Sequence, residues 1–253
     1  MAVSFLSPSA KDSRDPRDPK DRLIVALDVP GEAEALALVD RLEGTCRWFK
    51  VGMELYYAAG NSIVEQLRDC GLDVFLDLKL LDIPNTVAGA VRSVASSGAS
   101  LLTVHAGGGP AMLAAARAAA EGPNAPRLIA VTVLTSMDAA QLSAIGINTD
   151  PAQQVLRLAR LATAAGIDGL VCSPQETALL RRELGATPLL VVPGIRSADV
   201  PADDQRRTAT PSAAIASGAS MLVVGRPITQ AADPSAAARR ILAEIEIQAK
   251  QNA

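Results

Sequence analysis

Short apolar runs alternate with longer amphipathic segments along the chain from Leu23 onward. The apolar runs have the length of β-strands, and the longer segments repeat their apolar residues on one helical face. The pattern predicts eight strands, over residues 23–27, 47–51, 74–78, 101–104, 128–133, 169–172, 189–192 and 221–224. A helix is expected after each strand, over residues 32–42, 54–69, 86–96, 110–120, 151–165, 175–184, 212–217 and from 234 onward.

The predicted strands are continuously apolar, which is typical of parallel strands that are covered on both faces. Eight strand–helix units without a linker, in a chain of 253 residues, indicate an α/β protein built as a single (β/α)8 TIM barrel. A doubly wound sheet is the alternative, but no glycine-rich nucleotide-binding motif follows the first strand. We therefore predict one barrel domain over residues 23–253, preceded by a disordered leader over residues 1–22.

The composition restricts the classes of function. Hydrophobic residues make up 49% of the chain and aromatic residues only 2%, so Ala, Val, Leu and Ile must build the core. A net charge of −3 gives no reason to expect binding to nucleic acid. No apolar run approaches the roughly 18 residues of a membrane span, and residues 1–22 do not have the pattern of a signal peptide. We expect a cytoplasmic protein with no membrane partner.

The three cysteines, Cys46, Cys70 and Cys172, are odd in number, far apart in the sequence and set among apolar residues. This pattern predicts buried free thiols in a reducing compartment. No group of histidines, cysteines and carboxylates has the spacing of a metal site, so we expect no metal. His105 is the one histidine, and we interpret it as structural because no acidic partner can be assigned to it.

The segment of residues 74–86 places charged groups at the end of an apolar strand. Side chains alternate along a strand, so Asp77 and Lys79 share one face, and Phe75 continues that face backwards. Asp82 follows in the loop and is close enough in sequence to extend the array. Buried charges are costly unless they pair, so such an arrangement usually has a task. A purely structural ion pair is the alternative interpretation.

Other polar residues also follow predicted strands. In a (β/α)8 barrel the carboxyl ends of the strands meet at one mouth, which carries the catalytic groups. The residues at these positions are Asp28, Lys50, Thr135, Ser136, Pro193, Gly194, Arg196, Gly225 and Arg226. The loops after strands seven and eight usually bind phosphate, and here they supply Arg196, Arg226, Gln205 and Gly225. Residues 194–210 are polar and long enough to act as a lid.

These motifs together resemble orotidine 5′-monophosphate decarboxylases of the bacterial type. The resemblance extends from residue 23 to the end of the chain, and the leader lies outside it. Its motifs are residues 26–28, 49–52, 77–86, 133–136, 193–196 with Gln205, and 224–228. It implies a homodimeric barrel that converts orotidine 5′-monophosphate to UMP and CO₂ without a metal or an organic cofactor.

The resemblance also implies a role for each residue. Lys79 would donate a proton to C6 of the pyrimidine, beside Asp77, and a fixed ammonium there stabilises the carbanion that loss of CO₂ leaves. Lys50 would lie between Asp77 and the ribose, and Asp28 would contact a ribose hydroxyl. Asp82, Ile83 and Thr86 would reach the partner subunit's site. The remaining substrate-binding residues are Thr135 and Ser136 on the pyrimidine, Pro193, and Arg196, Gln205, Gly225 and Arg226 around the phosphate.

Two other functions remain open from the sequence. Related barrels that decarboxylate or synthesise sugar phosphates can share the Asp-x-Lys-x-x-Asp pattern but use Mg²⁺ to stabilise an enediolate. A non-catalytic barrel that senses a phosphate ester is the third possibility. Residues 134–136 and Gln205 argue against the sugar-phosphate enzymes, and the intact set of Lys50, Asp77, Lys79 and Asp82 argues against the sensor.

Overall fold

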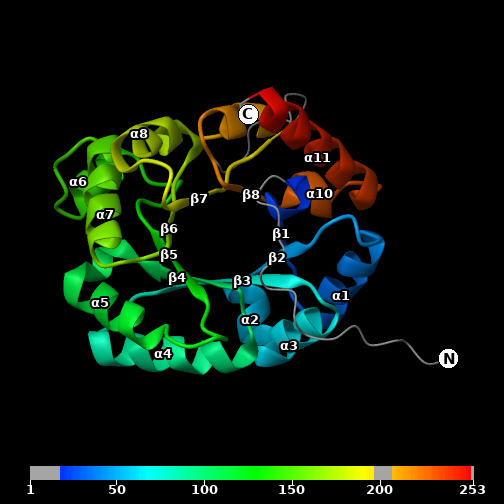
Figure 1. Cartoon of the computed structure of the whole chain (residues 1–253), viewed down its shortest axis with the longest axis horizontal. Coiled ribbons are helices and arrows are strands. Elements are labelled where there is room, and N and C mark those ends of the chain that lie inside the picture. Colours follow the sequence, from blue (N-terminus) through cyan, green and yellow to red (C-terminus); the bar gives the residue numbers. More distant parts are fainter. Residues whose placement is uncertain (1–17, 197–206, 252–253) are drawn as a thin grey trace.

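Eight parallel strands pair in sequence order and close into a barrel, because β1 pairs with both β2 and β8 (Figure 1). The structure is a computed structural model and describes residues 18–196 and 207–251. The strands are β1 (Leu23–Ala26), β2 (Trp48–Gly52), β3 (Asp73–Leu80), β4 (Leu101–His105), β5 (Arg127–Val131), β6 (Gly169–Val171), β7 (Leu189–Val192) and β8 (Met221–Val224). The predicted TIM barrel is confirmed.

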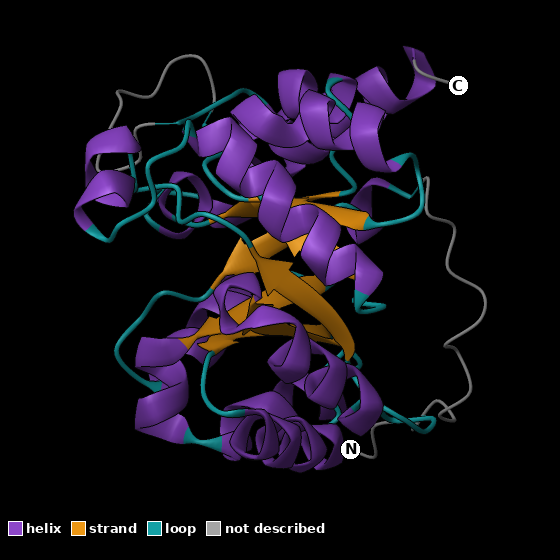
Figure 2. Ribbon diagram, turned by 90° about the vertical axis from the view of Figure 1, so that its left-hand side faces the viewer, coloured by secondary structure: helices purple, strands orange, loops and turns teal. Residues whose placement is uncertain are grey.

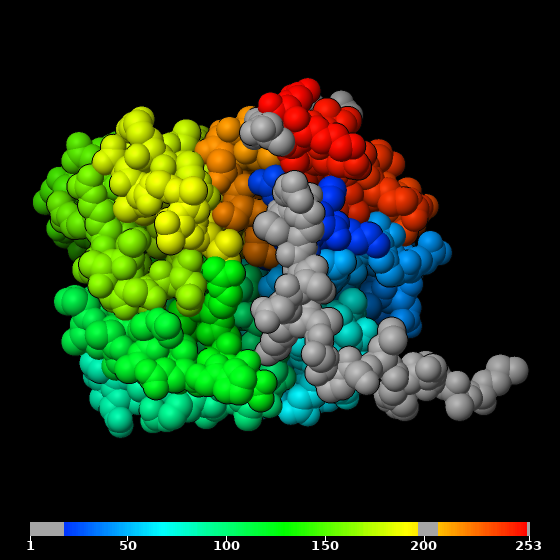
Figure 3. Space-filling view, in the orientation of Figure 1, coloured from blue at the N-terminus to red at the C-terminus, as the bar shows by residue number. Residues whose placement is uncertain are grey.

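Helices surround this barrel, and Figure 2 shows them on both sides of the strands. They are α1 (Glu32–Arg41), α2 (Met53–Ala59), α3 (Asn61–Asp69), α4 (Pro84–Ser97), α5 (Gly109–Ala119), α6 (Ala139–Ala144), α7 (Pro151–Ala164), α8 (Pro174–Leu184), α9 (Pro211–Ala216), α10 (Arg226–Thr229) and α11 (Pro234–Gln251). Two 3₁₀ turns, η1 (Pro19–Asp21) and η2 (Ala106–Gly108), complete the described elements. In Figure 3 the blue start of the barrel lies beside the red helix α11, which closes the ring of helices.

Local signals in the sequence explain where several helices begin and end. Helix α7 has Pro151 in its first turn, and the side chain of Asp150 accepts hydrogen bonds from two N–H groups of that turn. Helix α8 begins with a capping box between Ser173 and Glu176. Helix α4 ends at Gly98, whose φ of 76° places it in the left-handed region. Most of the predicted helix bounds agree with the structure because such signals are local.

One predicted helix is wrong. The segment of residues 54–69 is not continuous, because Gly60 has a φ of 67° and separates α2 from α3. A left-handed glycine ends an α-helix, and apolar periodicity alone does not reveal this break. The short helices α6 and α10 were not expected from the sequence either. Strand β5 ends at Val131, two residues before the predicted end at 133.

Large apolar side chains fill the inside of the barrel. The buried residues of the interior cluster are Ile24, Ala26, Trp48, Phe75, Leu101, Ile129, Val191, Met221 and Val223, and Val171 of β6 packs against them. Side chains of the opposite parity along the strands pack outward against the helices in a second, larger cluster. Because side chains alternate along a strand, the inward positions beyond Trp48 and Phe75 are Lys50 and Asp77 at the mouth. The packed interior therefore directs these charges toward the mouth.

The structure describes residues 18–22, which precede the predicted start of the domain at residue 23. They contain the turn η1, where Asp21 makes an ion pair of 2.6 Å with Arg47 and accepts a hydrogen bond of 3.3 Å from the indole N–H of Trp48. These contacts lie at the amino ends of the strands, opposite the mouth. Residues 1–17, which make up most of the predicted leader, lie outside the described residues.

The prediction for the cysteines is partly wrong. All three are free thiols, and Cys46 and Cys172 are buried, but Cys70 is exposed just after α3. Burial raises the pKa of the Cys46 thiol to about 12, so that thiol stays protonated at neutral pH.

None of the helices within the described residues combines the length and the apolar character that a membrane span requires.

The tight packing inside β6 gives a prediction about stability. Gly169→Ala should lower the free energy of unfolding by about 1–3 kcal/mol, as overpacking of a filled core does. A Cβ at this position would lie 2.6 Å from the carbonyl oxygen of Leu189 and 3.0 Å from Cδ1 of Ile129. Denaturant unfolding measures the change. The control is Gly89→Ala within α4, where Arg92 alone comes within 4 Å, and which should not destabilise the protein. Equal stability of both variants would contradict the prediction.

Candidate active site

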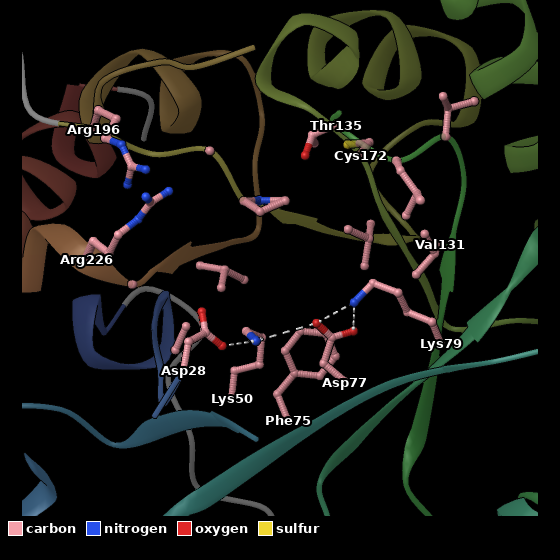
Figure 4. A pocket seen from close by; sticks show the side chains of 18 residues that line it. Asp28, Lys50, Phe75, Asp77, Lys79, Val131, Thr135, Cys172, Arg196 and Arg226 are labelled. Carbon is pink, nitrogen blue, oxygen red and sulfur yellow. Dashed lines mark hydrogen bonds and ion pairs between the residues drawn. The ribbon is translucent and has the colours of Figure 1, made fainter. Parts of the chain in front are cut away.

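The mouth of the barrel holds a cavity of about 240 Å³ (Figure 4). It is lined from every strand except β4, or from the loops that follow these strands, so residues far apart in the sequence meet there. The predicted residues among its lining are Asp28, Lys50, Asp77, Lys79, Thr135, Pro193, Arg196, Gly225 and Arg226. The charged groups of β1 to β3 lie on one side, and the two arginines after β7 and β8 lie on another.

Four charged side chains form a continuous row of alternating sign. The Lys50 ammonium lies 2.9 Å from Oδ1 of Asp28 and 3.7 Å from Oδ2 of Asp77. The Lys79 ammonium lies 2.9 Å from both carboxylate oxygens of Asp77. We call these four residues the charged row. Because each charge has a neighbour of opposite sign, the row tolerates partial burial, with 12% of the Lys50 side chain and 13% of the Asp77 side chain exposed.

An irregularity in β3 places Lys79, and simple alternation does not. From Leu76 to Leu80 β3 advances four residues, while its partner β4 advances two, from Leu102 to Val104. Lys79 has a φ of 51°, in a region that non-glycine residues enter at a cost of about 1–3 kcal/mol. Such bulges often turn a side chain toward an active site. The predicted alternation, which placed residues 75, 77 and 79 on one face, therefore applies to Phe75 and Asp77 alone.

Thr103 supports this irregular stretch from β4. Its hydroxyl accepts a hydrogen bond of 2.7 Å from the backbone N–H of Lys79 and donates one of 3.1 Å to Oδ1 of Asp77. The side chain is fully buried and replaces the backbone partner that the bulge removes from Lys79. Sequence analysis missed Thr103, because its position opposite the bulge depends on the pairing of β3 with β4.

The wall formed by β5 and β6 is largely apolar. Its side chains are Val131, Val133, Leu134, Val171 and Cys172, with Thr135 as the polar group. Burial raises the pKa of the Cys172 thiol to about 12, although its contact with the Thr177 hydroxyl acts in the opposite direction. The thiol is therefore neutral at pH 7, and this wall is suited to the face of a flat ring.

The wall formed by the β7 and β8 loops is cationic. Arg196 and Arg226 line the same cavity, and Figure 4 shows their guanidinium groups pointing toward one another. Gly194 has a φ of 79° and lets the chain turn between Pro193 and Arg196. Two guanidinium groups at one place match the oxygens of a dianionic phosphate. Gln205 lies outside the described residues.

Some predicted site residues do not line this cavity. Asp82, Ile83 and Thr86 are exposed, and Asp82 accepts a hydrogen bond of 2.6 Å from the N–H of Ile83. The sequence predicted that Asp82 would extend the array of Asp77 and Lys79. Within its own chain Asp82 does not do so. Ser136 is exposed outside the lining, so its contact with a substrate stays a prediction.

His105 has the environment of a structural histidine. Its Nδ1 accepts a hydrogen bond of 3.0 Å from the N–H of Gly107, and it lies outside the cavity lining. Burial, together with the positive charge of Lys79, lowers the pKa of His105, so the ring is neutral at pH 7. The contact also caps the turn η2, which agrees with the structural interpretation.

The donor groups of the cavity do not suit a divalent cation. Across residues 18–196 and 207–251, no three histidines, cysteines or carboxylates gather in a way that could hold a metal ion. Asp28 and Asp77 are the carboxylates of the lining, and each already faces an ammonium. What the site can do instead is hold a phosphate at one wall, a ring at the second, and a proton-donating ammonium at the third.

The structure is a parallel barrel whose strands carry paired charges and two arginines suited to phosphate at their carboxyl ends. These features define the class of (β/α)8-barrel enzymes that act on phosphorylated substrates. Comparison with family models narrows this class. The chain belongs to the Orotidine 5′-phosphate decarboxylase / HUMPS family, whose model matches residues 21–241.

Curated relatives and solved structures agree with this assignment. The chain is 52% identical over 226 residues to the orotidine 5′-phosphate decarboxylase of Actinobacillus succinogenes, covering 88% of this chain and 97% of the relative. It is 53% identical over 225 residues to that of Halorhodospira halophila, covering 88% and 95%. A crystal structure of the Lactobacillus acidophilus orotidine 5′-phosphate decarboxylase superposes with a TM-score of 0.79 at 40% identity, covering 89% of this chain and 99% of the other.

The hydroxyl of Thr103 gives a prediction about the site. Thr103→Val should lower the free energy of unfolding by about 1–3 kcal/mol, because it leaves the buried N–H of Lys79 without a partner. Thr103→Ser keeps the hydroxyl and should retain most of the stability. Thermal unfolding of both variants measures the difference. A valine variant as stable as the serine variant would show that this hydroxyl does not support the bulge.

Proposed function

We propose that this protein decarboxylates orotidine 5′-monophosphate to UMP and CO₂, the last step of UMP biosynthesis. The observation that carries the proposal is the charged row, which ends in the Lys79 ammonium inside a cavity that also contains Arg196 and Arg226. This arrangement accommodates a substrate with a dianion at one end and a reacting carboxylate at the other. Membership of the family and the named relatives support the same activity.

The walls of the cavity suggest how the substrate is held. The phosphate would bind to Arg196 and Arg226, with the backbone of Gly225 close by and Gln205 as a further predicted ligand. The pyrimidine would lie against the apolar wall beside Thr135, and Pro193 would bound the cavity between the ring and the phosphate. Asp28 and Lys50 would contact the ribose hydroxyls. Asp77 and Lys79 would then face C6 and its carboxylate.

The reaction needs one group that can stabilise an anion and then protonate it. The bond between C6 and the carboxylate breaks, CO₂ leaves, and the electron pair stays on C6. The Lys79 ammonium stabilises this carbanion and transfers its proton to C6, and solvent returns a proton to the amine. Asp77 holds the ammonium at 2.9 Å from both of its oxygens, so Lys79 is oriented before the substrate binds. No step requires a metal or an organic cofactor.

A second copy of the chain would complete the site. Asp82, Ile83 and Thr86 lie between β3 and the first turn of α4, and 67% of Ile83 is exposed. The neighbouring Leu81 is 57% exposed. Exposed apolar side chains beside a polar site are typical of an interface. We infer a homodimer in which these residues reach the partner's cavity.

We also place the enzyme in the cytoplasm. The three cysteines are free, and a reducing compartment keeps thiols in that state.

One assay tests the proposed activity. The purified protein is incubated with orotidine 5′-monophosphate in excess EDTA, and formation of UMP is followed. Turnover would support the proposal. Activity only on sugar phosphates with Mg²⁺ would support the related metal-dependent enzymes instead, and binding of phosphate esters without turnover would support a sensor.

Lys79→Ala should lower kcat by at least about 10²–10⁴-fold, because it removes the proton donor. The fold should persist, since Asp77 keeps Lys50 and Thr103 as partners. Turnover and thermal unfolding are measured together. Lys250→Ala is the control, because Lys250 is exposed and pairs with Glu246 on α11, away from the cavity. A kcat near that of the unchanged protein would exclude Lys79 as the donor.

Arg226→Ala should raise KM for the nucleotide by roughly 10–100-fold, since a charged hydrogen bond contributes about 1.5–3 kcal/mol. Arg160→Ala, at an exposed ion pair with Glu183, is the control and should leave KM unchanged. The same variants are assayed with the nucleoside that lacks the phosphate. If Arg226 holds the phosphate, its loss should affect the nucleotide alone, and equal effects on both substrates would count against this role.

Ile83→Glu should shift the protein from dimer to monomer in sedimentation equilibrium and should lower turnover, because a buried glutamate opposes association. Ile247→Glu is the control, since Ile247 is equally apolar and 61% exposed on α11. A wild-type protein that is monomeric and fully active would refute the shared site.

A further inference from the structure

Arg207 joins two loops of the mouth that are far apart in the sequence. It precedes α9, and its side chain reaches the loop that follows β5. There its Nη2 donates a hydrogen bond of 2.9 Å to the carbonyl oxygen of Leu134, and its Nε donates one of 3.4 Å to that of Thr135. Both of these residues line the cavity.

A buried carboxylate fixes the other edge of the guanidinium. Nη1 of Arg207 forms an ion pair with Glu176 on α8, and the two side chains are 11% and 5% exposed. Glu176 in turn accepts a hydrogen bond of 3.1 Å from the N–H of Ser173 at the start of that helix. The guanidinium therefore has a rigid support, because its partner belongs to a helix packed on the barrel.

The backbone near Arg207 is also fixed. The N–H of Arg196 donates to the carbonyl of Ala209 at 2.9 Å, and the N–H of Ala209 donates to the carbonyl of Gly194 at 3.2 Å. Ile195 and Ala209 form an isolated bridge. Arg207 thus lies two residues from this bridge, and Arg196 of the cationic wall lies directly beside it.

The loop that receives Arg207 follows β5 and includes a backbone turn. Within it, the N–H of Met137 donates a hydrogen bond of 2.9 Å to the carbonyl of Leu134. Leu134 is 38% exposed, so apolar packing holds it only in part. The two carbonyls bound by Arg207 belong to the only two residues of this loop beyond Val133 that line the cavity.

We propose that Arg207 is a positioning residue, which holds the wall of Leu134 and Thr135 at a fixed place relative to the cationic wall. The inference rests on the proposed function for its effect on catalysis. The planar fork of arginine reaches two carbonyls and one carboxylate at once, which the single ammonium of lysine does not do. A purely structural ion pair would need only the contact with Glu176.

The variant Arg207→Lys separates these two roles, because it keeps the charge beside Glu176 and loses the fork. We expect kcat/KM for the nucleotide to fall by about 10–100-fold through misplacement of the wall, with thermal stability close to that of the unchanged protein. Arg160→Lys, at the exposed ion pair with Glu183, is the matched control and should change neither quantity.

A second measurement does not depend on catalysis. Amide hydrogen exchange is followed in the peptide of residues 132–138, where the N–H of Met137 reports on the loop. This peptide should exchange faster in Arg207→Lys than in the unchanged protein, and exchange elsewhere in the barrel should be the same. Unchanged exchange there would overturn the inference, whether or not the protein decarboxylates the nucleotide. Faster exchange with an unchanged kcat/KM in an active enzyme would overturn its catalytic part.

Thr135→Ala supplies a further check. If Arg207 acts through Thr135, the double variant Arg207→Lys, Thr135→Ala should lose less kcat/KM than the product of the two single fold-losses. If the losses multiply, Arg207 acts through another route and the proposal is wrong.

Discussion

The carboxylate of Asp77 is the interaction on which the site depends. It accepts Lys79 on both oxygens at 2.9 Å and has Lys50 at 3.7 Å, so it binds two ammonium groups together in a partly buried place. Without it the two like charges would repel each other at the mouth and would have to face solvent. With Asp28 at the far end, the row alternates in sign, and Lys79 still presents its ammonium to the cavity.

The barrel supplies this arrangement in two ways. Regular alternation carries Lys50 and Asp77 to the mouth above an interior filled by Trp48 and Phe75. Lys79 instead needs a bulge, a left-handed backbone and the hydroxyl of Thr103. The strain of one such residue is small beside the stabilisation from a closed, packed barrel, so the fold can maintain it.

Different strands hold different parts of the proposed substrate. The charged row belongs to β1–β3, the apolar wall to β5 and β6, and the cationic wall to the loops after β7 and β8. Binding energy from the phosphate, remote from the reacting carbon, can be used to hold the ring against the row. Arg207 connects the cationic wall with the apolar wall through the carbonyls of Leu134 and Thr135. Phosphate binding at one wall can therefore influence the position of the ring at the other.

Residue patterns along the chain were enough to predict the barrel, the positions of Asp28, Lys50, Asp77, Arg196 and Arg226 at its mouth, and the family. These follow from periodicity, from local caps and from residue types at strand ends, all of which act over a few residues. The folded structure was needed to reveal the break at Gly60, the exposure of Cys70, and the support that Thr103 and Arg207 give to the site. Each of these depends on backbone conformation or on contacts between distant segments, which side-chain patterns along one strand or helix do not encode.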